Sequence, residues 1–379
     1  MFVTATPEFG RALARLATTH PDSLGLAGPA EARASLAGQG ESYAAWRLDL
    51  PPHALPEEVR AAGSEALVVR VPARPSESMP HAATLEFTAL GLAPAGFGPV
   101  PVRLVDAADS PLGHALLVQS FVPGRVLPDS AWTDNVLTAH ARQLASLHKR
   151  RYPGHGPVDA AEAELARELD PLAILEGAVA YWERVRPDLL RDSAAGRLTT
   201  AARALALEAR PAFESVPYAL LHGDTVAANI LVDQGMPRYI DWEWSSIGDP
   251  ARDLALIGAP EGASPWYITM DERREDLLLD AYLEAGGGGG ADDLHRLRVR
   301  RRFHETIEQL FTAVHFLSRL QPVGRAVVVD GKIMEPGSEV PAVPVPDRQR
   351  PVYERAVAAM FRSVYARVGD GLGEPSIGT

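Results

Sequence analysis

Residues 222–241 read His-Gly-Asp-Thr-Val-Ala-Ala-Asn-Ile-Leu-Val-Asp-Gln-Gly-Met-Pro-Arg-Tyr-Ile-Asp, and no other stretch of the 379-residue chain says as much about its fold. An apolar run at 218–221 leads into this stretch and is typical of a β-strand. Gly223 then lets the backbone turn sharply, so that the side chain of Asp224 projects away from the strand. We therefore expect Asp224 to face a substrate.

The second half of the stretch predicts a β-hairpin. Apolar runs at 230–232 and 238–240 flank a five-residue turn centred on Gly235. Asn229 and Asp241 each lie six positions from that glycine, so the hairpin would place them opposite each other, with Cβ atoms roughly 5 Å apart. An amide oxygen and a carboxylate at that separation suit a hard cation such as Mg²⁺.

The spacing of these residues resembles the catalytic core of the aminoglycoside phosphotransferase and choline kinase superfamily, whose members are relatives of the protein kinases. The similarity is carried by H-x-D-x-x-x-x-N at 222–229 and by Ile-Asp-Trp-Glu at 240–243. A second motif, Gly-Asp-Pro-Ala-Arg-Asp-Leu-Ala at 248–255, is similar to the G-D-P-x-x-D-L-A signature of the family. Two linked motifs in the expected order favour the family over the alternative, in which Asp224 and Asp241 are ordinary turn carboxylates.

The resemblance implies the fold class and the domain organisation. It implies an α+β, bilobal protein-kinase-like fold, with an N-terminal antiparallel sheet lobe with one helix and a larger, mainly helical C-terminal lobe. We expect residues 1–122 to form the nucleotide-binding lobe and residues 123–379 the catalytic and acceptor-binding lobe. A chain of 379 residues exceeds the size at which a single core keeps growing, which agrees with two lobes.

A glycine-rich segment near the N-terminus is a candidate phosphate-binding loop. Residues 36–48 resemble the strand-loop-strand that covers the nucleotide phosphates in this superfamily. Gly38 and Gly40 would let backbone N–H groups approach the anion closely, and Ser42 lies beside them. The alternative is a plain hairpin turn, since glycine-rich turns are common.

A second segment of the first lobe resembles the hinge between the lobes. It comprises residues 115–124, which read as a strand closed by a Pro-Gly pair. The resemblance implies that backbone groups of Ser120 and Val122 contact the adenine base.

The strand expected at 67–71 departs from the family pattern. The family usually has a phosphate-binding lysine there, yet this chain has no lysine before Lys149. The resemblance therefore gives that role to Arg70, and the helix expected at 82–90 supplies Glu86 to orient it. Arginine binds phosphate bidentately, although it differs from lysine in reach and shape. The alternative is a surface arginine at the end of an edge strand.

Composition limits the partners and the cellular setting. The chain has no cysteine and a formal net charge of −12. Nucleic acid and anionic lipid both require a basic face, so we expect small molecules as partners, while the oligomeric state stays open. Without an apolar run long enough to span a membrane, a signal-peptide pattern or cysteine, the sequence predicts a cytoplasmic protein.

The activity that the resemblance implies is transfer of the γ-phosphoryl group of ATP or GTP to a hydroxyl of a small molecule. Asp224 would be the catalytic base, and Asn229 and Asp241 would hold Mg²⁺ between the phosphates. The acceptor is not readable from the sequence, because antibiotics, choline-like metabolites, amino alcohols, sugars and nucleosides all occur as acceptors across the superfamily.

Five other residues receive structural or open interpretations. We expect His222 to pack beneath the loop, Asp249 to cap the following helix and Asp253 to brace the catalytic loop. Glu305 and Glu308 lie off the apolar stripe of a late helix. Either they help to attract a cationic acceptor, or they are solvated acids partnered by the arginines nearby.

Other chemistries fit the sequence less well. A Walker A loop is absent, because Lys332 is followed by isoleucine and Ala326 stands where that motif needs its first glycine. Residues 40–44 lack the second glycine of a hydrolase nucleophile elbow and precede an expected strand where that motif needs a helix. The remaining alternative is a catalytically silent nucleotide-binding regulator of the same fold, which only the arginine at position 70 supports.

Overall fold

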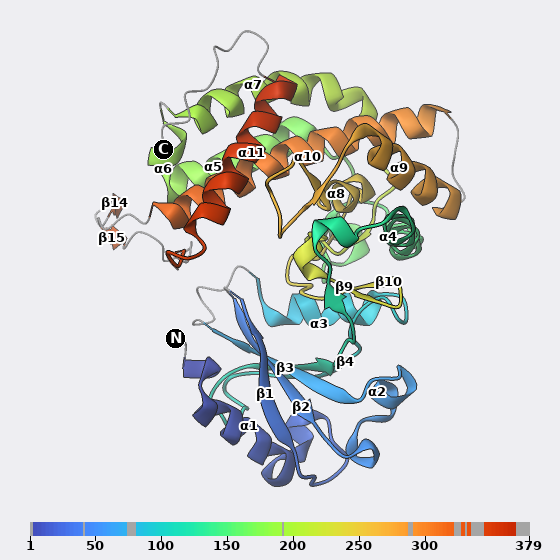
Figure 1. The fold of residues 1–379 in the computed structure, drawn as a ribbon, viewed down its shortest axis with the longest axis vertical. Helices are drawn as coiled ribbons and strands as arrows, with labels where there is room; N and C mark the ends of the chain where they lie inside the picture. The colour runs from blue at the N-terminus through green and yellow to red at the C-terminus, as the bar shows by residue number, and fades with distance from the viewer. Residues whose placement is uncertain are drawn as a thin grey trace. The chain divides into compact units, whose positions relative to one another are not determined.

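The computed structural model (Figure 1) divides the chain into two compact units. It describes residues 3–40, 42–73, 81–191, 193–286, 291–321, 327–329, 332–334 and 345–368. Unit 1 comprises residues 1–125, 231–234 and 238–245. Unit 2 comprises residues 126–230, 235–237 and 246–379. The functional division that we expect at residues 122 and 123 stays a prediction.

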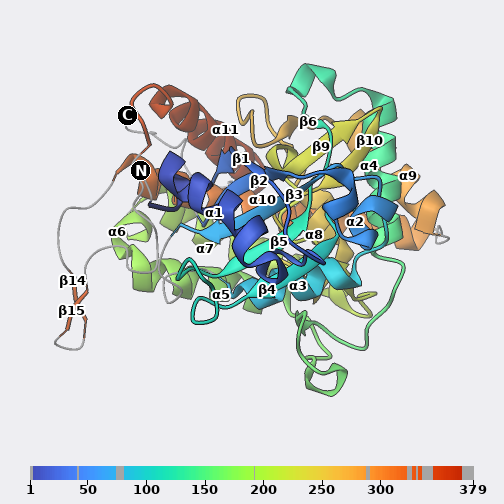
Figure 2. The ribbon, with the colours of Figure 1, turned by 90° about the horizontal axis from the view of Figure 1, so that it is seen from below.

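A five-stranded antiparallel sheet forms the framework of unit 1, in the order β1-β2-β3-β5-β4 (Figures 1 and 2). Its strands are β1 (Arg33–Gln39), β2 (Tyr43–Asp49), β3 (Ala66–Pro72), β4 (Pro101–Val105) and β5 (Leu116–Ser120). Along β3 the side chains alternate between the two faces of the sheet. Val69 and Val71 belong to the apolar core. Arg70 therefore points to the opposite face, where Glu86 lies.

Three helices accompany this sheet, namely α1 (Pro7–Thr19), the short α2 (Glu57–Ala61) and α3 (Ala83–Leu92). Apolar side chains of α1, such as Leu13 and Leu16, pack in one core with Trp46 of β2. The expected single helix with Glu86 is α3. The apolar spacing at residues 9–16 predicts α1 and its packing on the sheet of unit 1. The short α2 is an additional helix.

Unit 2 is mainly helical. Its helices are α4 (Asp134–Leu147), α5 (Pro171–Val185), α6 (Pro187–Leu190), α7 (Ala194–Ala209), α8 (Pro250–Ala255), α9 (Glu272–Gly286), α10 (Ala291–Leu320) and α11 (Arg350–Val368). The last of these confirms the amphipathic helix that the spacing of apolar residues predicts at 352–368. Among the described residues, no helix combines the length and apolar character needed to cross a membrane.

Short strands complete the fold. They form the sheets β10-β9-β6, β7-β11-β8, β12-β13 and β14-β15. Their bounds are β6 (Arg125–Val126), β7 (Gly156–Pro157), β8 (Ala219–Leu221), β9 (Ile230–Asp233), β10 (Met236–Tyr239), β11 (Ser246–Gly248), β12 (Gly258–Ala259), β13 (Ile268–Thr269), β14 (Val327–Val329) and β15 (Lys332–Met334). The Asp-Gly pair at 330–331 between two apolar runs predicts a hairpin. Its two strands are β14 and β15, while the two turn residues lie outside the described residues.

The hairpin of β9 and β10 confirms one sequence prediction and corrects its geometry. Only Gln234 and Gly235 separate the two strands, rather than the five residues that we expected. Both have positive φ, at 49° and 82°, as the tight turn of a two-residue hairpin requires. Asn229 belongs to unit 2 and Asp241 to unit 1, and their shared cation stays a prediction.

Candidate functional site

The loop that carries Asp224 begins directly after the buried strand β8. Gly223 has a φ of 83°, a left-handed conformation that glycine adopts without steric cost, so the chain turns away from the sheet at this point. The buried carboxylate of Asp253, on α8, accepts hydrogen bonds from the backbone N–H groups of His222 (2.8 Å) and Gly223 (2.9 Å). The expected bracing of this loop by Asp253 is thereby confirmed.

Asp253 is fully satisfied in its buried position. Besides the two backbone donors, its Oδ2 lies 3.1 Å from Nε2 of His148, and its backbone carbonyl accepts a 2.6 Å hydrogen bond from the hydroxyl of Thr225. Burial alone would raise the pKa of Asp253, but the hydrogen bond and charge of His148 outweigh it and hold that pKa below 3.8. The brace therefore acts as a fixed negative charge.

Asp224 and Asn229 form a pair within this loop. Nδ2 of Asn229 donates to Oδ2 of Asp224 at 2.7 Å and to its backbone carbonyl at 3.1 Å. The backbone N–H of Asp224 lies 3.2 Å from Nδ1 of the fully buried His222, which confirms that this histidine packs beneath the loop. Because the amide nitrogen of Asn229 is occupied, its oxygen is the atom that could ligate a cation.

Asp249 also behaves as the sequence predicts. Its carboxylate accepts a 3.0 Å hydrogen bond from the backbone N–H of Ala251 and so caps α8. Nε of Arg300 lies 3.1 Å and 3.2 Å from the two carboxylate oxygens. His304 approaches one of them at 3.1 Å. Burial opposes ionisation, but these two partners lower the pKa of Asp249 below 3.8.

In unit 1, Arg70 is a buried residue of an interior strand, so the alternative of a surface arginine on an edge strand is wrong. Its guanidinium donates to Oδ1 of Asp241 at 2.6 Å and lies 3.4 Å from Oε2 of Glu86. The same group stacks over the ring of Tyr43, with 4.4 Å to the ring centroid. The expected contact between Arg70 and Glu86 is present.

Carboxyl groups outnumber cations around Arg70. Asp241, Glu86 and Glu243 all interact with this one guanidinium. Burial raises the pKa of Glu86 to about 7, with Arg70 offsetting part of the effect. Burial and then the charge of Asp241 raise the pKa of Glu243 to about 8. Among the described residues, Oε2 of Glu243 is also buried without a hydrogen-bond partner. A role for Glu243 was not predicted, although its place two residues after Asp241 is a usable signal.

Asp241 has an unusual backbone conformation. Its φ is 68°, in the left-handed region that non-glycine residues adopt at a cost of roughly 1–3 kcal/mol. Aspartate tolerates this region better than most residues. Such conformations persist where the surrounding structure fixes them, and they gather at functional sites. Here the conformation accompanies the short contact from Arg70 to the Asp241 carboxylate.

The glycine-rich loop joins β1 to β2. Among the described residues, a Cβ added at Gly38 would meet nothing within 4 Å, and one at Gly40 would meet only the carbonyl of Tyr43 at 3.8 Å. Neither glycine is therefore required by the packing of the protein itself. Ser42 is buried, and its side chain hydrogen-bonds the carboxylate of Glu243. The loop is thus linked to the carboxylates around Arg70.

The hinge residues lie at the end of β5. The backbone N–H of Ser120 donates to the carbonyl of Val100 at 2.9 Å, and its hydroxyl accepts from the N–H of Val100 at 2.8 Å. Val122 follows two residues later and is also buried. Of the backbone groups of Ser120, the N–H is thus engaged within unit 1.

Among the described residues, no three His, Cys, Asp or Glu side chains form a metal-binding cluster. The oxygen donors present still fit Mg²⁺, which usually takes one or two protein carboxylates, keeps several waters and is completed by substrate phosphates. Asp241 offers such a carboxylate, and the unpartnered Oε2 of Glu243 belongs to the same group of carboxyl side chains around Arg70.

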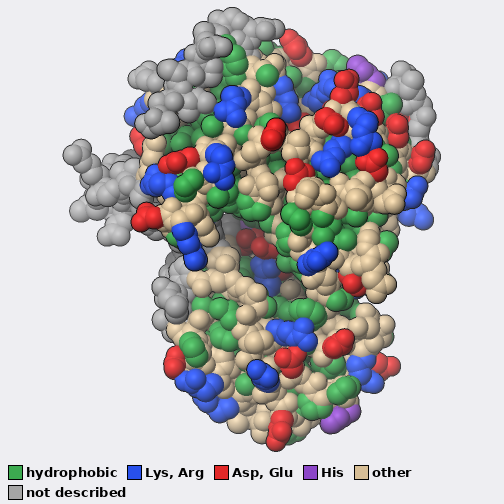
Figure 3. All heavy atoms as spheres, viewed as in Figure 1, with side chains coloured by type: hydrophobic (Ala, Val, Ile, Leu, Met, Phe, Trp, Pro, Cys, Tyr) green, Lys and Arg blue, Asp and Glu red, His purple; other side chains and the backbone are tan. Residues whose placement is uncertain are grey.

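Charged side chains intermingle on the face drawn in Figure 3. Exposed ion pairs of unit 2 include Arg273 with Asp134 and Arg203 with Glu176. These exposed pairs contribute little to stability, about 0–1 kcal/mol each. The charges that matter for the site are the buried ones.

The two units together have a protein-kinase-like fold. The profile of the Phosphotransferase enzyme family matches residues 58–300, more than half of the chain, and the protein belongs to this family. Viomycin phosphotransferase of Streptomyces vinaceus is 37% identical over 153 residues, which cover 38% of this chain and 50% of that protein. The matched part thus spans about half the length of this relative.

Solved structures agree on the fold. An ethanolamine kinase of Plasmodium vivax matches with a TM-score of 0.56 at 12% identity, covering 88% of this chain and 83% of that one. An aminoglycoside phosphotransferase in complex with GDP and kanamycin matches with a TM-score of 0.52 at 14% identity, covering 94% and 98%. The expected superfamily and the bilobal kinase-like fold class are therefore confirmed.

Proposed function

We propose that this protein transfers the γ-phosphoryl group of ATP or GTP to a hydroxyl group of a small molecule. The observation that carries the proposal is the Asp224–Asn229 pair on a loop whose backbone is held by the buried Asp253. Phosphoryl transfer relies mainly on positioning and on stabilisation of charge, so a rigidly held carboxylate is what the chemistry needs most.

Asp224 is the base in this proposal. The hydrogen bond from Asn229 fixes the orientation of its carboxylate. Asp224 accepts the hydroxyl proton of the acceptor while the acceptor oxygen bonds to the γ-phosphorus. The bond from that phosphorus to the bridging oxygen breaks, and the nucleoside diphosphate leaves with its electron pair. A positioned base of this kind contributes about 10²–10⁴-fold to the rate.

Unit 1 supplies the contacts to the nucleotide. Arg70 steadies the phosphates and Glu86 orients Arg70, in line with their 3.4 Å contact. The loop with Gly38, Gly40 and Ser42 covers the phosphates. Adenine meets the carbonyl of Ser120 and the N–H of Val122, since the N–H of Ser120 already donates to Val100.

Asn229 and Asp241 would hold Mg²⁺. The excess of carboxylates over guanidinium around Arg70 would repel a triphosphate unless a further cation intervenes. When bound, Mg²⁺ neutralises charge on the phosphates and so lowers the energy of the transition state. Because nucleoside triphosphates are substrates, we place the protein in the cytoplasm.

The acceptor class with most support is an antibiotic. That support comes from the similarity to viomycin phosphotransferase over 153 residues. We would test it by measuring nucleotide consumption with viomycin, kanamycin, a macrolide, choline and ethanolamine, with Asp224→Asn as the matched control. Consumption that depends on an acceptor and vanishes in the variant supports the proposal, whereas equal rates in both proteins contradict it.

The regulatory alternative is less favoured, because Asp224, Asn229 and Asp241 are all present with organised contacts. Calorimetry with Mg-ATP and Mg-GTP shows whether the protein binds nucleotide, as both the kinase and the regulator must. Binding without turnover against any acceptor would favour the regulator. Lack of binding at millimolar nucleotide would exclude both the kinase and the regulator.

A further inference from the structure

The helix that braces the catalytic loop is too short to hold its own position. α8 has six residues, and helices of this length are unstable in isolation. Yet its Asp253 fixes the backbone of His222 and Gly223, next to the proposed base. The position of the loop therefore depends on what holds α8.

The N-terminal end of α8 is held by α10. Asp249, the residue that caps α8, is paired with Arg300 and His304, both of which lie on α10. All three side chains are buried. A carboxylate at the start of a helix interacts favourably with the helix dipole, and the two partners fix that carboxylate to the longer helix.

The C-terminal end of α8 is also held by α10. Carbonyl groups in the last turn of a helix lack partners within the helix. The carbonyl of Asp253 accepts from Thr225 of the catalytic loop at 2.6 Å, and the carbonyl of Leu254 accepts from Nε of Arg301 at 3.2 Å. Arg301 thus contacts α8 one residue away from the brace.

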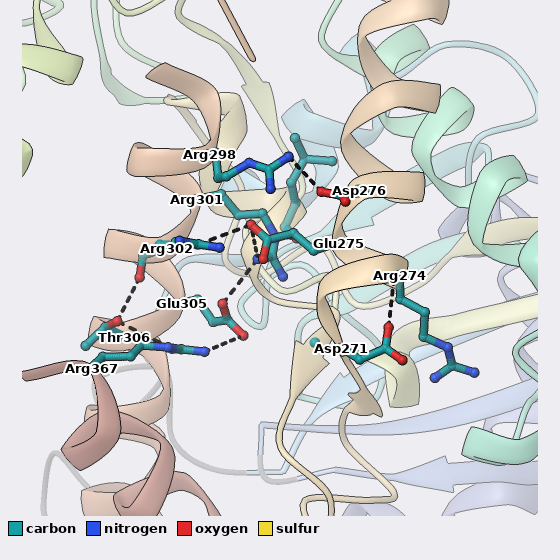
Figure 4. A network of polar contacts seen from close by, with 12 residues as sticks. Asp271, Arg274, Glu275, Asp276, Arg298, Arg301, Arg302, Glu305, Thr306 and Arg367 are labelled. Carbon is teal, nitrogen blue, oxygen red and sulfur yellow. Dashed lines mark hydrogen bonds and ion pairs between the residues drawn. The ribbon is translucent and has the colours of Figure 1, made fainter. Parts of the chain in front are cut away.

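Burying Arg301 at this position costs desolvation free energy. Its side chain is fully buried, with Glu305 at 3.2 Å and Glu275 of α9 at 3.4 Å (Figure 4). Burying charges costs desolvation free energy, and well-packed apolar residues often stabilise such a site as well or better. Stability alone therefore gives little reason for an arginine at this position, whereas a donor that reaches the Leu254 carbonyl does.

The C-terminal helix α11 joins the same network. Arg367 lies 3.0 Å from Oε1 of Glu305, on the far side of that carboxylate from Arg301. Glu305 is therefore buried rather than solvated, but its partner Arg301 is one of the nearby arginines that we expected to pair with it. Glu308 is paired with Arg252 of α8 at 2.8 Å.

We propose that Arg301 is a positioning residue for the catalytic loop, which it reaches through the carbonyl of Leu254 and the brace Asp253. Arg300 and His304 fix one end of α8, and Arg301 fixes the other. The inference rests on the proposed phosphotransfer for its kinetic consequence, but its structural consequence at His222 and Gly223 can be measured without any substrate.

Hydrogen–deuterium exchange of the full-length protein tests the structural consequence. In Arg301→Gln we expect the peptide that contains the His222 and Gly223 amides to exchange about tenfold faster, because its acceptor Asp253 is less well fixed. Arg302→Gln is the matched control, since Arg302 also contacts Glu275, which lies on α9 and not on α8. Unchanged exchange of that peptide in a folded Arg301→Gln protein would overturn the proposal.

Kinetics test the second consequence. Arg301→Gln should lower kcat about tenfold with little change in the nucleotide KM, because the base is displaced while unit 1 is intact. Arg301→Lys should restore part of kcat, and it replaces the glutamine variant if that one does not fold. A rise in KM at constant kcat would overturn the positioning role. If the wild type transfers no phosphate, the proposed function fails, while the exchange experiment still decides the role of Arg301.

Discussion

Buried carboxyl groups have opposite pKa shifts around the loop of Asp224 in unit 2 and around Arg70 in unit 1. In unit 2, Asp253 and Asp249 have enough donors to hold their pKa values below the ordinary value. In unit 1, burial raises the pKa values of Glu86 and Glu243 to about 7 and about 8. In the first region the buried carboxylates have hydrogen-bond donors from the protein itself. In the second region carboxyl groups outnumber cations.

This difference indicates that one region holds a loop in place and the other binds an additional charged group. Groups that must stay in place are surrounded by donors, since a satisfied buried network is rigid. A region with perturbed pKa values and unpartnered oxygens is typical of a site that binds an additional charged group. Substitutions at Asp224, Asp249, Arg70 and Gly40, each with comparison variants, would break or sharpen the comparison, and their expected effects decrease in that order.

The largest effect is expected from Asp224→Asn. Loss of the base should lower turnover about 10²–10⁴-fold while the affinity for Mg-nucleotide stays unchanged. Asp241→Asn should mainly weaken the binding of Mg-nucleotide. Steady-state kinetics and calorimetry measure both. A rate for Asp224→Asn within about threefold of the wild type would mean that another group is the base.

Asp249→Asn tests the completeness of the unit 2 network. Leaving Arg300 without its anion should lower the free energy of unfolding by about 3–5 kcal/mol at neutral pH. The pKa of Asp249 is lower in the folded state, so its stabilisation is present above the unfolded-state value of 3.8 and is lost as the pH falls. Urea unfolding from pH 7 to pH 3 should therefore show the two proteins converging.

Asp188→Asn is the control for that series, because Asp188 pairs with Arg186 in a half-exposed position. We expect it to change the free energy of unfolding by about 1 kcal/mol or less. If Asp249→Asn changed the free energy of unfolding equally little, the network at the start of α8 would not be a rigid, stabilising part of unit 2.

Arg70→Ala tests the cation of unit 1. A charge-assisted contact to phosphate contributes roughly 1.5–3 kcal/mol, so the nucleotide KM should rise or kcat should fall about tenfold or more. Arg70→Lys should recover only part of this, because an ammonium cannot reproduce the bidentate guanidinium. Arg47→Ala, on the neighbouring strand and paired with Asp49, is the control. Wild-type kinetics in Arg70→Ala would remove Arg70 from the nucleotide site.

The smallest effect is expected from Gly40→Ala. The added methyl meets no closer atom than the Tyr43 carbonyl at 3.8 Å, so thermal stability should be unchanged, while the nucleotide KM rises about threefold if phosphates approach this backbone. Gly10→Ala is the opposite control, since its Cβ would lie 2.5 Å from Trp46 and should lower stability by about 1–3 kcal/mol without affecting nucleotide binding. An unchanged KM in Gly40→Ala would favour a plain hairpin turn.

Local sequence determined the parts of this protein that depend on neighbouring residues. The strand before His222, the turn at Gly223, the cap at Asp249 and the final helix at 350–368 follow from glycine, capping and apolar periodicity. The order of the motifs was enough to predict the superfamily, because the spacing of Asp224 and Asn229 is itself local. The length of the β9–β10 turn was missed, because Gln234 adopts positive φ, which sequence patterns rarely assign to a residue other than glycine or asparagine.

Only the tertiary structure decided how charge is shared between distant residues. Arg70 is 171 residues from Asp241, and Arg301 is 47 residues from Leu254, so no spacing rule relates them. The left-handed backbone of Asp241 and the raised pKa of Glu243 likewise arise from burial and from neighbours brought together by folding. The physical reason is that desolvation and Coulomb interactions depend on distance in space, whereas turns, caps and periodic faces depend on distance along the chain.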